Sequence, residues 1–128
     1  MTTPARSTVF IVEDSAPIRT RLGELLGEID GVEVVGEAES PTDAIAGILS
    51  TSANWVVLDF QLVGGTGVDV LRAVRPKAPQ INFIVLTNHP SAQYRRTCID
   101  SGAGWFFDKS TEFGKIKDVI AAPVAANS

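Results

Sequence analysis

Polar side chains that could do chemistry come directly after the apolar stretches of this sequence. Four short apolar runs are each followed at once by acidic, hydroxyl or basic residues, namely Glu13 and Asp14, Asp59, Thr87, and Asp108 and Lys109. In an open α/β sheet, ligands bind at the edge where the carboxyl ends of the strands meet. One polar residue after one strand is usually only the start of a loop, but four strands that deliver such groups to one edge indicate a site.

The charges of these residues favour a bound divalent cation. Carboxylates about 5 Å apart repel by about 3 kcal/mol per pair at an effective dielectric constant of about 20. Asp14, Asp59 and Glu13 would therefore need a counter-charge, and Lys109 supplies only one positive charge. Mg²⁺ supplies two, takes oxygen ligands and is typically held by one or two carboxylates. The chain has one histidine and one cysteine, which argues against a zinc site built from such residues.

Phosphoryl transfer onto an aspartate is the chemistry that this set of groups can support. The carboxylate of Asp59 would attack phosphorus as the nucleophile. Mg²⁺ and Lys109 would neutralise charge on the phosphoryl oxygens, and Thr87 would hydrogen-bond one of them. The sequence therefore predicts a carboxylate that becomes phosphorylated.

The apolar runs themselves predict the sheet that positions these residues. Unbroken runs rich in β-branched residues are typical of strands buried on both faces of a parallel sheet, and they occur at 9–12, 55–58 and 83–86. The more mixed segment 32–38 predicts an edge strand, and 105–107 predicts a short fifth strand.

Helical patterns fill the gaps between these strands. Apolar residues recur on one helical face in Ile18, Leu22 and Leu26, and similar patterns give five predicted helices, at 18–29, 41–49, 68–74, 92–99 and 112–122. The glycine-rich segment 64–67 follows a strand but lacks the Lys-Ser/Thr pair of a phosphate-binding loop, so it is predicted to be a plain loop. Strands that alternate with helices of this length predict an α/β fold, a doubly wound five-stranded parallel sheet flanked by five helices.

Composition excludes several classes of function. A length of 128 residues with 45% hydrophobic and 20% charged residues predicts one globular domain. The net charge of −4 argues against a nucleic-acid surface, which needs a basic stripe. No apolar run approaches the roughly 20 residues of a membrane helix, and the single cysteine, Cys98, gives no support for an oxidising compartment. We expect a soluble, cytoplasmic protein that contacts neither nucleic acid nor membrane.

Residues 8–122 resemble the receiver domain of bacterial two-component response regulators. The segments that carry the resemblance agree with the family in order and separation: Val12-Glu13-Asp14-Ser15, Leu58-Asp59, Leu86-Thr87 and Asp108-Lys109-Ser110. The resemblance implies a flavodoxin-like sheet of the receiver type over 8–122. A disordered N-terminal tail at 1–7 and a C-terminal tail at 123–128 complete this division of the chain.

The resemblance also implies a role for each residue of the metal and phosphorylation site. Asp59 is similar to the phospho-acceptor of the family. Asp14 is similar to the direct Mg²⁺ ligand, with Glu13 acting through water, and the backbone carbonyl of Gln61 completes the metal shell. Lys109 is similar to the family's lysine that faces the phosphoryl group.

A switch is implied in the same way. Thr87 is similar to the hydroxyl residue that is drawn toward the phosphoryl group, and Phe106, three residues before the lysine, would then rotate inward. The sequence departs from the family at Val63, where proline is common, and at Phe106, which lacks the hydroxyl of the commoner tyrosine. These departures concern the loop and the switch rather than the phosphorylation chemistry.

Two further positions are implied to tune the lifetime of the phosphoryl group. In the family, the residues two after the acceptor and two after the switch hydroxyl flank the path of the hydrolytic water, and here they are Gln61 and His89. By itself His89 could simply begin an exposed loop beside Pro90. Its charge changes near neutral pH, so we expect dephosphorylation to vary with pH through this side chain.

The resemblance implies a signalling module that catalyses only its own phosphorylation and dephosphorylation. Its expected phosphodonor is a sensor histidine kinase or a histidine phosphotransfer protein. A downstream protein would bind the face made by 92–99, 105–107 and 112–122, where a phosphorylation-dependent homodimer could also form and where Trp105 either packs inward or faces the partner. The sequence predicts either a stand-alone regulator or a fragment of a longer one.

Three alternatives belong to other classes of function. A haloacid-dehalogenase-like phosphatase would carry Asp-x-Asp after the first strand, where this chain has Glu13-Asp14-Ser15-Ala16. A flavodoxin-like flavin binder would need a hydroxyl- and glycine-rich loop there instead of two acids. A receiver-like module that interacts without phosphate is the third alternative, and the complete set of site residues weighs against it.

Overall fold

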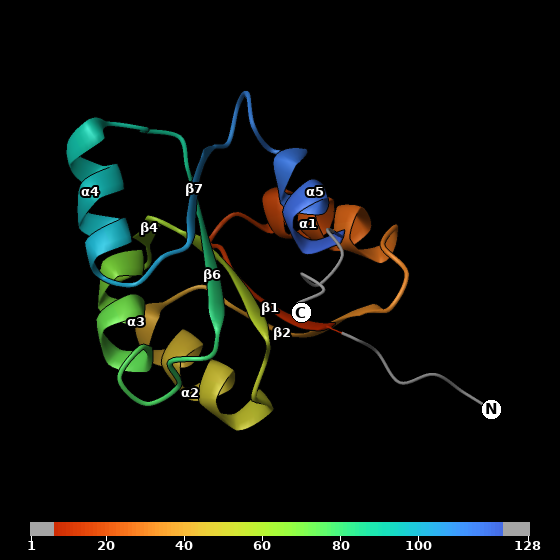
Figure 1. Cartoon of the computed structure of the whole chain (residues 1–128), viewed down its shortest axis with the longest axis horizontal. Coiled ribbons are helices and arrows are strands. Elements are labelled where there is room, and N and C mark those ends of the chain that lie inside the picture. Colours follow the sequence, from red (N-terminus) through yellow and green to blue (C-terminus); the bar gives the residue numbers. More distant parts are fainter. Residues whose placement is uncertain (1–6, 122–128) are drawn as a thin grey trace, which may run out of the picture.

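Five parallel strands form the central sheet of the computed structural model, which describes residues 7–121 (Figure 1). The strands are β1 (Ser7–Val12), β2 (Val32–Ala38), β3 (Trp55–Asp59), β6 (Asn82–Thr87) and β7 (Trp105–Asp108). Their spatial order is β2-β1-β3-β6-β7, and every neighbouring pair is parallel. The chain therefore reverses direction of winding between β1 and β3, which is where doubly wound sheets place their ligands. The predicted five-stranded sheet is confirmed.

Five helices cover the two faces of the sheet in the described part of the chain, as predicted. Figure 1 shows two of them on one face, α1 (Ala16–Gly27) and α5 (Lys115–Ala121). The other face carries α2 (Pro41–Thr51), α3 (Gly67–Val74) and α4 (Ala92–Asp100). The predicted helix at 112–122 begins only at Lys115, because hydrogen bonds between Asp108 and Glu112 hold the preceding residues in turns.

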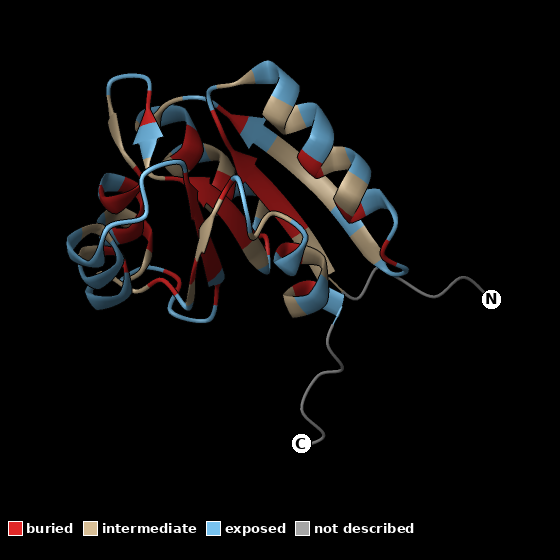
Figure 2. Ribbon diagram, turned by 90° about the horizontal axis from the view of Figure 1, so that it is seen from above, coloured by how far each residue is buried: buried red, intermediate tan, exposed pale blue. Residues whose placement is uncertain are grey.

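The strand residues alternate between two apolar clusters. Val9 and Ile11 point toward α1 and α5 and pack with Leu22 and Ile116. Phe10 lies on the opposite face, in the larger cluster that α2, α3 and α4 cover. Figure 2 shows the resulting pattern, in which the middle strands are largely buried and the helices are buried only on their inner sides. Burial on both faces explains the unbroken apolar runs in the sequence.

The aromatic pair at the start of β3 and β7 shows that Trp105 packs against a neighbour. The ring centroids of Trp55 and Trp105 lie 5.3 Å apart, and both residues adjoin the cluster under α1 and α5. Trp105 is half-buried, so one part of its side chain packs inward and the rest remains accessible to solvent.

The segment after β3 is a small hairpin and not the plain loop that its glycines predict. β4 (Gln61–Leu62) and β5 (Gly65–Thr66) pair in the antiparallel direction, and Gly64 at the turn has a φ of +82°. Gly67 then starts α3, and its N–H donates to the carbonyl oxygen of Phe60 at 2.7 Å. The hairpin fixes where the chain runs immediately after Asp59.

The described residues begin and end close to the predicted boundaries of the domain. β1 begins at Ser7, one residue earlier than the predicted start of the domain. The remaining residues of the predicted tails at 1–7 and 123–128, and Ala122, lie outside the described residues. Within residues 7–121, no helix is both long enough and apolar enough to cross a membrane.

Replacement of Gly67 by alanine should destabilise the protein. A Cβ atom at this position would lie 2.6 Å from the backbone oxygen of Asp59, so the backbone near the site would have to move. We expect Gly67→Ala to lower the free energy of unfolding by about 1–3 kcal/mol, the usual cost of overpacking. Urea unfolding followed by tryptophan fluorescence measures this change.

Gly23→Ala in the middle of α1 is the matched control. Nothing lies within 4 Å of a Cβ atom at Gly23, so alanine should raise the free energy of unfolding by about 0.5–1 kcal/mol. If the two variants had the same stability, the close approach of Gly67 to Asp59 would not be a constraint on the fold.

Candidate phosphorylation and metal site

The predicted site residues meet in one hollow at the carboxyl edge of the sheet. The register of the strands places their carboxyl ends side by side: Val12 pairs with Leu58, Asp59 with Leu86, and Thr87 with Asp108. The hollow has a volume of about 250 Å³. Its lining includes every predicted site residue except Phe106: Glu13, Asp14, Asp59, Gln61, Thr87, His89 and Lys109.

A buried lysine between two carboxylates dominates the site. The Nζ atom of Lys109 lies 2.7 Å from Oε1 of Glu13 and 3.0 Å from Oδ2 of Asp59. The side chain of Glu13 is 2% exposed, and those of Asp59 and Lys109 are each 7% exposed. Buried charges of this kind are stable only when they are paired and hydrogen-bonded. One cation thus serves two anions, which leaves the set with a net negative charge.

Burial and neighbouring charges shift the pKa values of this set. Burial raises the pKa of Glu13 to about 7, and the negative charge of Asp59 adds to the rise, although the hydrogen bond from Lys109 opposes it. For Lys109, burial favours the neutral amine, but the contacts with Glu13 and Asp59 outweigh it and raise the pKa above its ordinary value. Lys109 therefore remains an ammonium ion at neutral pH.

The acidic residues can hold a metal ion. One carboxylate oxygen each from Glu13, Asp14 and Asp59 all lie within 4.8 Å of one another. Asp14 is exposed, whereas the other two are buried, so the cluster opens to solvent on the Asp14 side. Three hard oxygen donors with more negative charge than Lys109 neutralises fit Mg²⁺.

Thr87 connects the ends of β6 and β7 next to this cluster. It is 1% exposed. Its Oγ1 accepts a hydrogen bond from the backbone N–H of His89 at 3.0 Å, and its carbonyl oxygen accepts one from the N–H of Lys109 at 2.8 Å. The backbone that carries Lys109 is therefore fixed relative to the hydroxyl that was predicted to act with it.

The loop after β7 is held by side chains for which the sequence predicted no such role. Oδ1 of Asp108 accepts hydrogen bonds from the N–H of Ser110 at 2.8 Å and from its hydroxyl at 2.6 Å. Oε1 of Glu112 accepts the N–H of Asp108 at 3.0 Å, and its Oε2 lies 2.8 Å from the Nζ of Lys115. Asp-x-Ser is a recognised turn pattern, so the first of these contacts had a detectable signal.

The same contacts explain the pKa values of the two acids. The hydroxyl and N–H of Ser110 lower the pKa of Asp108, and the hydrogen bond from Lys115 lowers the pKa of Glu112. Both side chains therefore act as charged acceptors that fix the loop carrying Lys109.

Phe106 and the predicted lifetime residues lie around the site. Phe106 is 5% exposed and packs inward in the larger apolar cluster, and its carbonyl oxygen accepts a hydrogen bond from Arg95 of α4 at 3.4 Å. Gln61 and His89 are exposed and line both the site hollow and an adjoining hollow that reaches Tyr94 of α4. Tyr94 stacks on Phe60, the residue after Asp59, with ring centroids 4.3 Å apart.

The fold and the site together define a class: flavodoxin-like α/β domains with an acidic cluster after β1 and β3, a hydroxyl after β6 and a lysine after β7. Residues 9–121 match the sequence profile of the response regulator receiver domain. The chain therefore belongs to the response regulator receiver family. This assignment removes the alternatives of a haloacid-dehalogenase-like phosphatase and a flavin binder.

A curated relative and two solved structures illustrate the relationship. The chain is 32% identical over 101 residues to the DNA-binding transcriptional activator DevR/DosR of Mycobacterium tuberculosis, covering 79% of this chain and 46% of that protein. A two-component response regulator of the LuxR family from Aurantimonas sp. SI85-9A1 has a similar fold, with a TM-score of 0.86 at 23% identity, covering 94% of this chain and 86% of that one.

The signal receiver domain of the response regulator NarL from Mycobacterium tuberculosis also has the same fold. Its TM-score is 0.83 at 24% identity, and the match covers 94% of this chain and 100% of that one. The chain spans about half the length of the curated relatives it matches.

The raised pKa of Glu13 predicts how stability depends on pH. Because the folded protein holds this proton more tightly than the unfolded chain, its contribution to stability is present at low pH and is lost as the pH rises from about 4.5 to about 7. In metal-free buffer, we expect Glu13→Gln to flatten this part of the profile of unfolding free energy against pH. Urea unfolding at a series of pH values measures it, and parallel profiles for wild type and variant would contradict the raised pKa.

Proposed function

We propose that this receiver domain accepts a phosphoryl group on Asp59 from a sensor histidine kinase or a histidine phosphotransfer protein. One observation carries the proposal: Asp59 lies 3.0 Å from the ammonium of Lys109 and in the same acidic cluster as Glu13 and Asp14. A nucleophilic carboxylate, a fixed cation and a metal-binding set of oxygens are what transfer of a phosphoryl group to aspartate requires.

The reaction follows from these positions. A carboxylate oxygen of Asp59 attacks phosphorus, the bond between phosphorus and the donor nitrogen breaks, and the imidazole of the donor leaves with that electron pair. Asp59 becomes an acyl phosphate. The ammonium of Lys109 pairs with the phosphoryl oxygens as their charge grows, and the hydroxyl of Thr87 donates a hydrogen bond to one of them.

Mg²⁺ would be held by the side chains of Asp14 and Asp59 and by the backbone carbonyl of Gln61, with Glu13 acting through water. Its chemical contribution is to neutralise negative charge on the phosphoryl oxygens. Glu13 is engaged by Lys109 and also accepts the N–H of Ser15 at 3.1 Å, which supports an indirect role for this carboxylate.

Phosphorylation would act on the face formed by α4, β7 and α5. When the phosphoryl group takes the hydroxyl of Thr87, the hydrogen bond between Thr87 and the N–H of His89 is exchanged for a new one. His89 begins the connection to α4, so this exchange biases α4 and, through it, the packing around Phe106. We propose that a downstream protein, or a second phosphorylated copy of the chain, binds this face.

Gln61 and His89 would set the lifetime of the phosphoryl group. Both are exposed at the rim of the hollow, where water reaches the acyl phosphate. A side chain at either position can orient or exclude the attacking water, so replacement of Gln61 or His89 would change the rate of dephosphorylation.

Receiver domains of response regulators are signalling modules and not classical enzymes. The only reactions we propose for this chain are the phosphorylation and dephosphorylation of its own aspartate. A histidine kinase as the donor would place the protein in the cytoplasm, and the partial coverage of the relatives would suit a receiver within a longer regulator as well as one that acts alone.

Phosphorylation of Asp59 can be measured by intact mass. With Mg²⁺ and acetyl phosphate as a small phosphodonor, the mass should rise by one phosphoryl group, about 80 Da, and Asp59→Asn should abolish the gain because it removes the nucleophile. Asp100→Asn is the matched control, since this carboxylate on α4 is 73% exposed and outside the site, and it should still be phosphorylated. Equal mass gain in Asp59→Asn would reject the proposal.

A further inference from the structure

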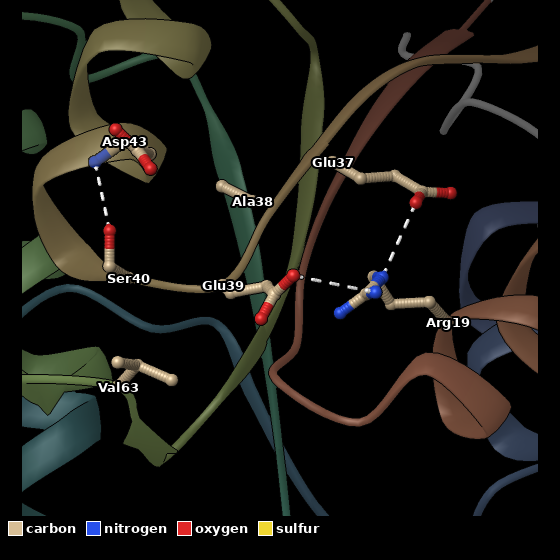
Figure 3. Close-up of a pocket in the computed structure, with 7 residues that line it drawn as sticks. All are labelled: Arg19, Glu37, Ala38, Glu39, Ser40, Asp43 and Val63. Carbon is tan, nitrogen blue, oxygen red and sulfur yellow. Dashed lines mark hydrogen bonds and ion pairs between the residues drawn. The ribbon is translucent and has the colours of Figure 1, made fainter.

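Arg19 of α1 is held between two loops beside the phosphorylation site. Its Nη1 donates a hydrogen bond to the carbonyl oxygen of Glu13 at 2.7 Å. Its Nε lies 3.4 Å from Oε1 of Glu37, and its Nη2 lies 3.6 Å from Oε2 of Glu39. Figure 3 shows the guanidinium reaching from α1 to these two glutamates across a hollow of about 670 Å³. The Arg19 side chain is only 17% exposed, whereas those of Glu37 and Glu39 are 47% and 58% exposed, so the guanidinium is held in place at the bottom of a hollow that is open to water on the glutamate side.

The end of β2 and the residue after it, 37–39, lie between the loop that carries Glu13 and the hairpin that carries Gln61. On one side, the N–H of Glu13 donates to the carbonyl oxygen of Ala38 at 3.0 Å. On the other, the carbonyl oxygen of Glu39 accepts the N–H of Val63, in the hairpin that starts at Gln61, at 3.1 Å. The loop after β1, the loop after β2 and the hairpin are thus one hydrogen-bonded unit, and Arg19 joins the first two by its side chain.

We propose that Arg19 is a positioning residue for the metal site: its fork of donors fixes the Glu13-Asp14 backbone and, through Glu39, the hairpin that carries Gln61. The inference rests on the proposed Mg²⁺-dependent function. A planar guanidinium can reach three acceptors in fixed directions, which a lysine ammonium on the same helix cannot do. Groups that orient metal ligands in this way commonly change metal affinity by about 10–100-fold when they are removed.

The sign of the effect distinguishes positioning from simple electrostatics. Arg19 is a positive charge near a cation site, and its removal also leaves Glu37 and Glu39 without this partner. If only charge mattered, Mg²⁺ would therefore bind more tightly to Arg19→Met than to the wild type, because a repelling positive charge is gone. It would bind to Arg19→Lys as tightly as to the wild type, because the charge is kept. Loss of positioning makes it bind more weakly to both.

The test is a titration of the full chain with MgCl₂, followed by backbone amide chemical shifts. We expect the dissociation constant for Mg²⁺ to rise roughly tenfold in Arg19→Met, with a smaller rise in the same direction in Arg19→Lys. Arg96→Met is the matched control for net charge, because Arg96 is 85% exposed on α4, and its effect should stay below about twofold owing to screening by salt. Unchanged amide shifts in β6 and β7 before Mg²⁺ is added show that each variant is folded.

Phosphorylation by acetyl phosphate gives a second measurement. The Mg²⁺ concentration for half-maximal rate should rise roughly tenfold in Arg19→Met, while the rate at saturating Mg²⁺ returns close to wild type. A general loss of structure would instead lower the rate at every Mg²⁺ concentration. Equal or tighter Mg²⁺ binding in Arg19→Met and Arg19→Lys would overturn the role of Arg19 alone, whereas a wild-type chain that binds no Mg²⁺ would overturn the proposed function and this inference with it.

Discussion

The buried ammonium of Lys109 is the contact on which the geometry of the site depends. It lies within 3.0 Å of carboxylate oxygens from two different strand ends, those of Glu13 and Asp59, and both carboxylates are almost fully buried. Without that cation, two negative charges would face each other in a region that water hardly reaches, and one would have to take up a proton. The raised pKa of Glu13 shows that even one lysine only partly offsets this cost.

Much of the surrounding structure can be understood as a means of holding that lysine and its partners in place. The parallel sheet aligns the strand ends, and the backbone bond from Lys109 to Thr87 fixes the lysine at the end of β7. Asp108 and its hydrogen bonds to Ser110 stiffen the loop that follows. Arg19 ties the loop of the acidic pair to its neighbour on the other side of β1. Thr87 lies beside Asp59 in the same hollow, so phosphorylation of Asp59 would first alter the hydrogen bond between Thr87 and His89.

The sequence predicted the five strands, the five helices and most of the residues that line the hollow, because each leaves a local signal. Apolar runs mark buried strands, and the polar residue that ends each run falls at a known edge of the sheet. The ion pairs of Arg19 with Glu37 and Glu39 leave no such signal. Arg19 is separated from these glutamates by 18 and 20 positions in the sequence, and the contacts depend on how α1 packs. The hairpin after Asp59 and the late start of α5 were missed for a similar reason, because both depend on hydrogen bonds that form only in the folded chain.

A double-mutant cycle tests most directly whether Lys109 and Asp59 form the interaction described here. The free energy of unfolding would be measured in metal-free buffer for wild type, Lys109→Met, Asp59→Asn and the double variant. We expect Lys109→Met to be strongly destabilising alone and clearly less so when Asp59 is already asparagine, with a coupling energy of more than about 1 kcal/mol. Effects that add to within about 0.5 kcal/mol would show that the two side chains do not interact, and would contradict the account.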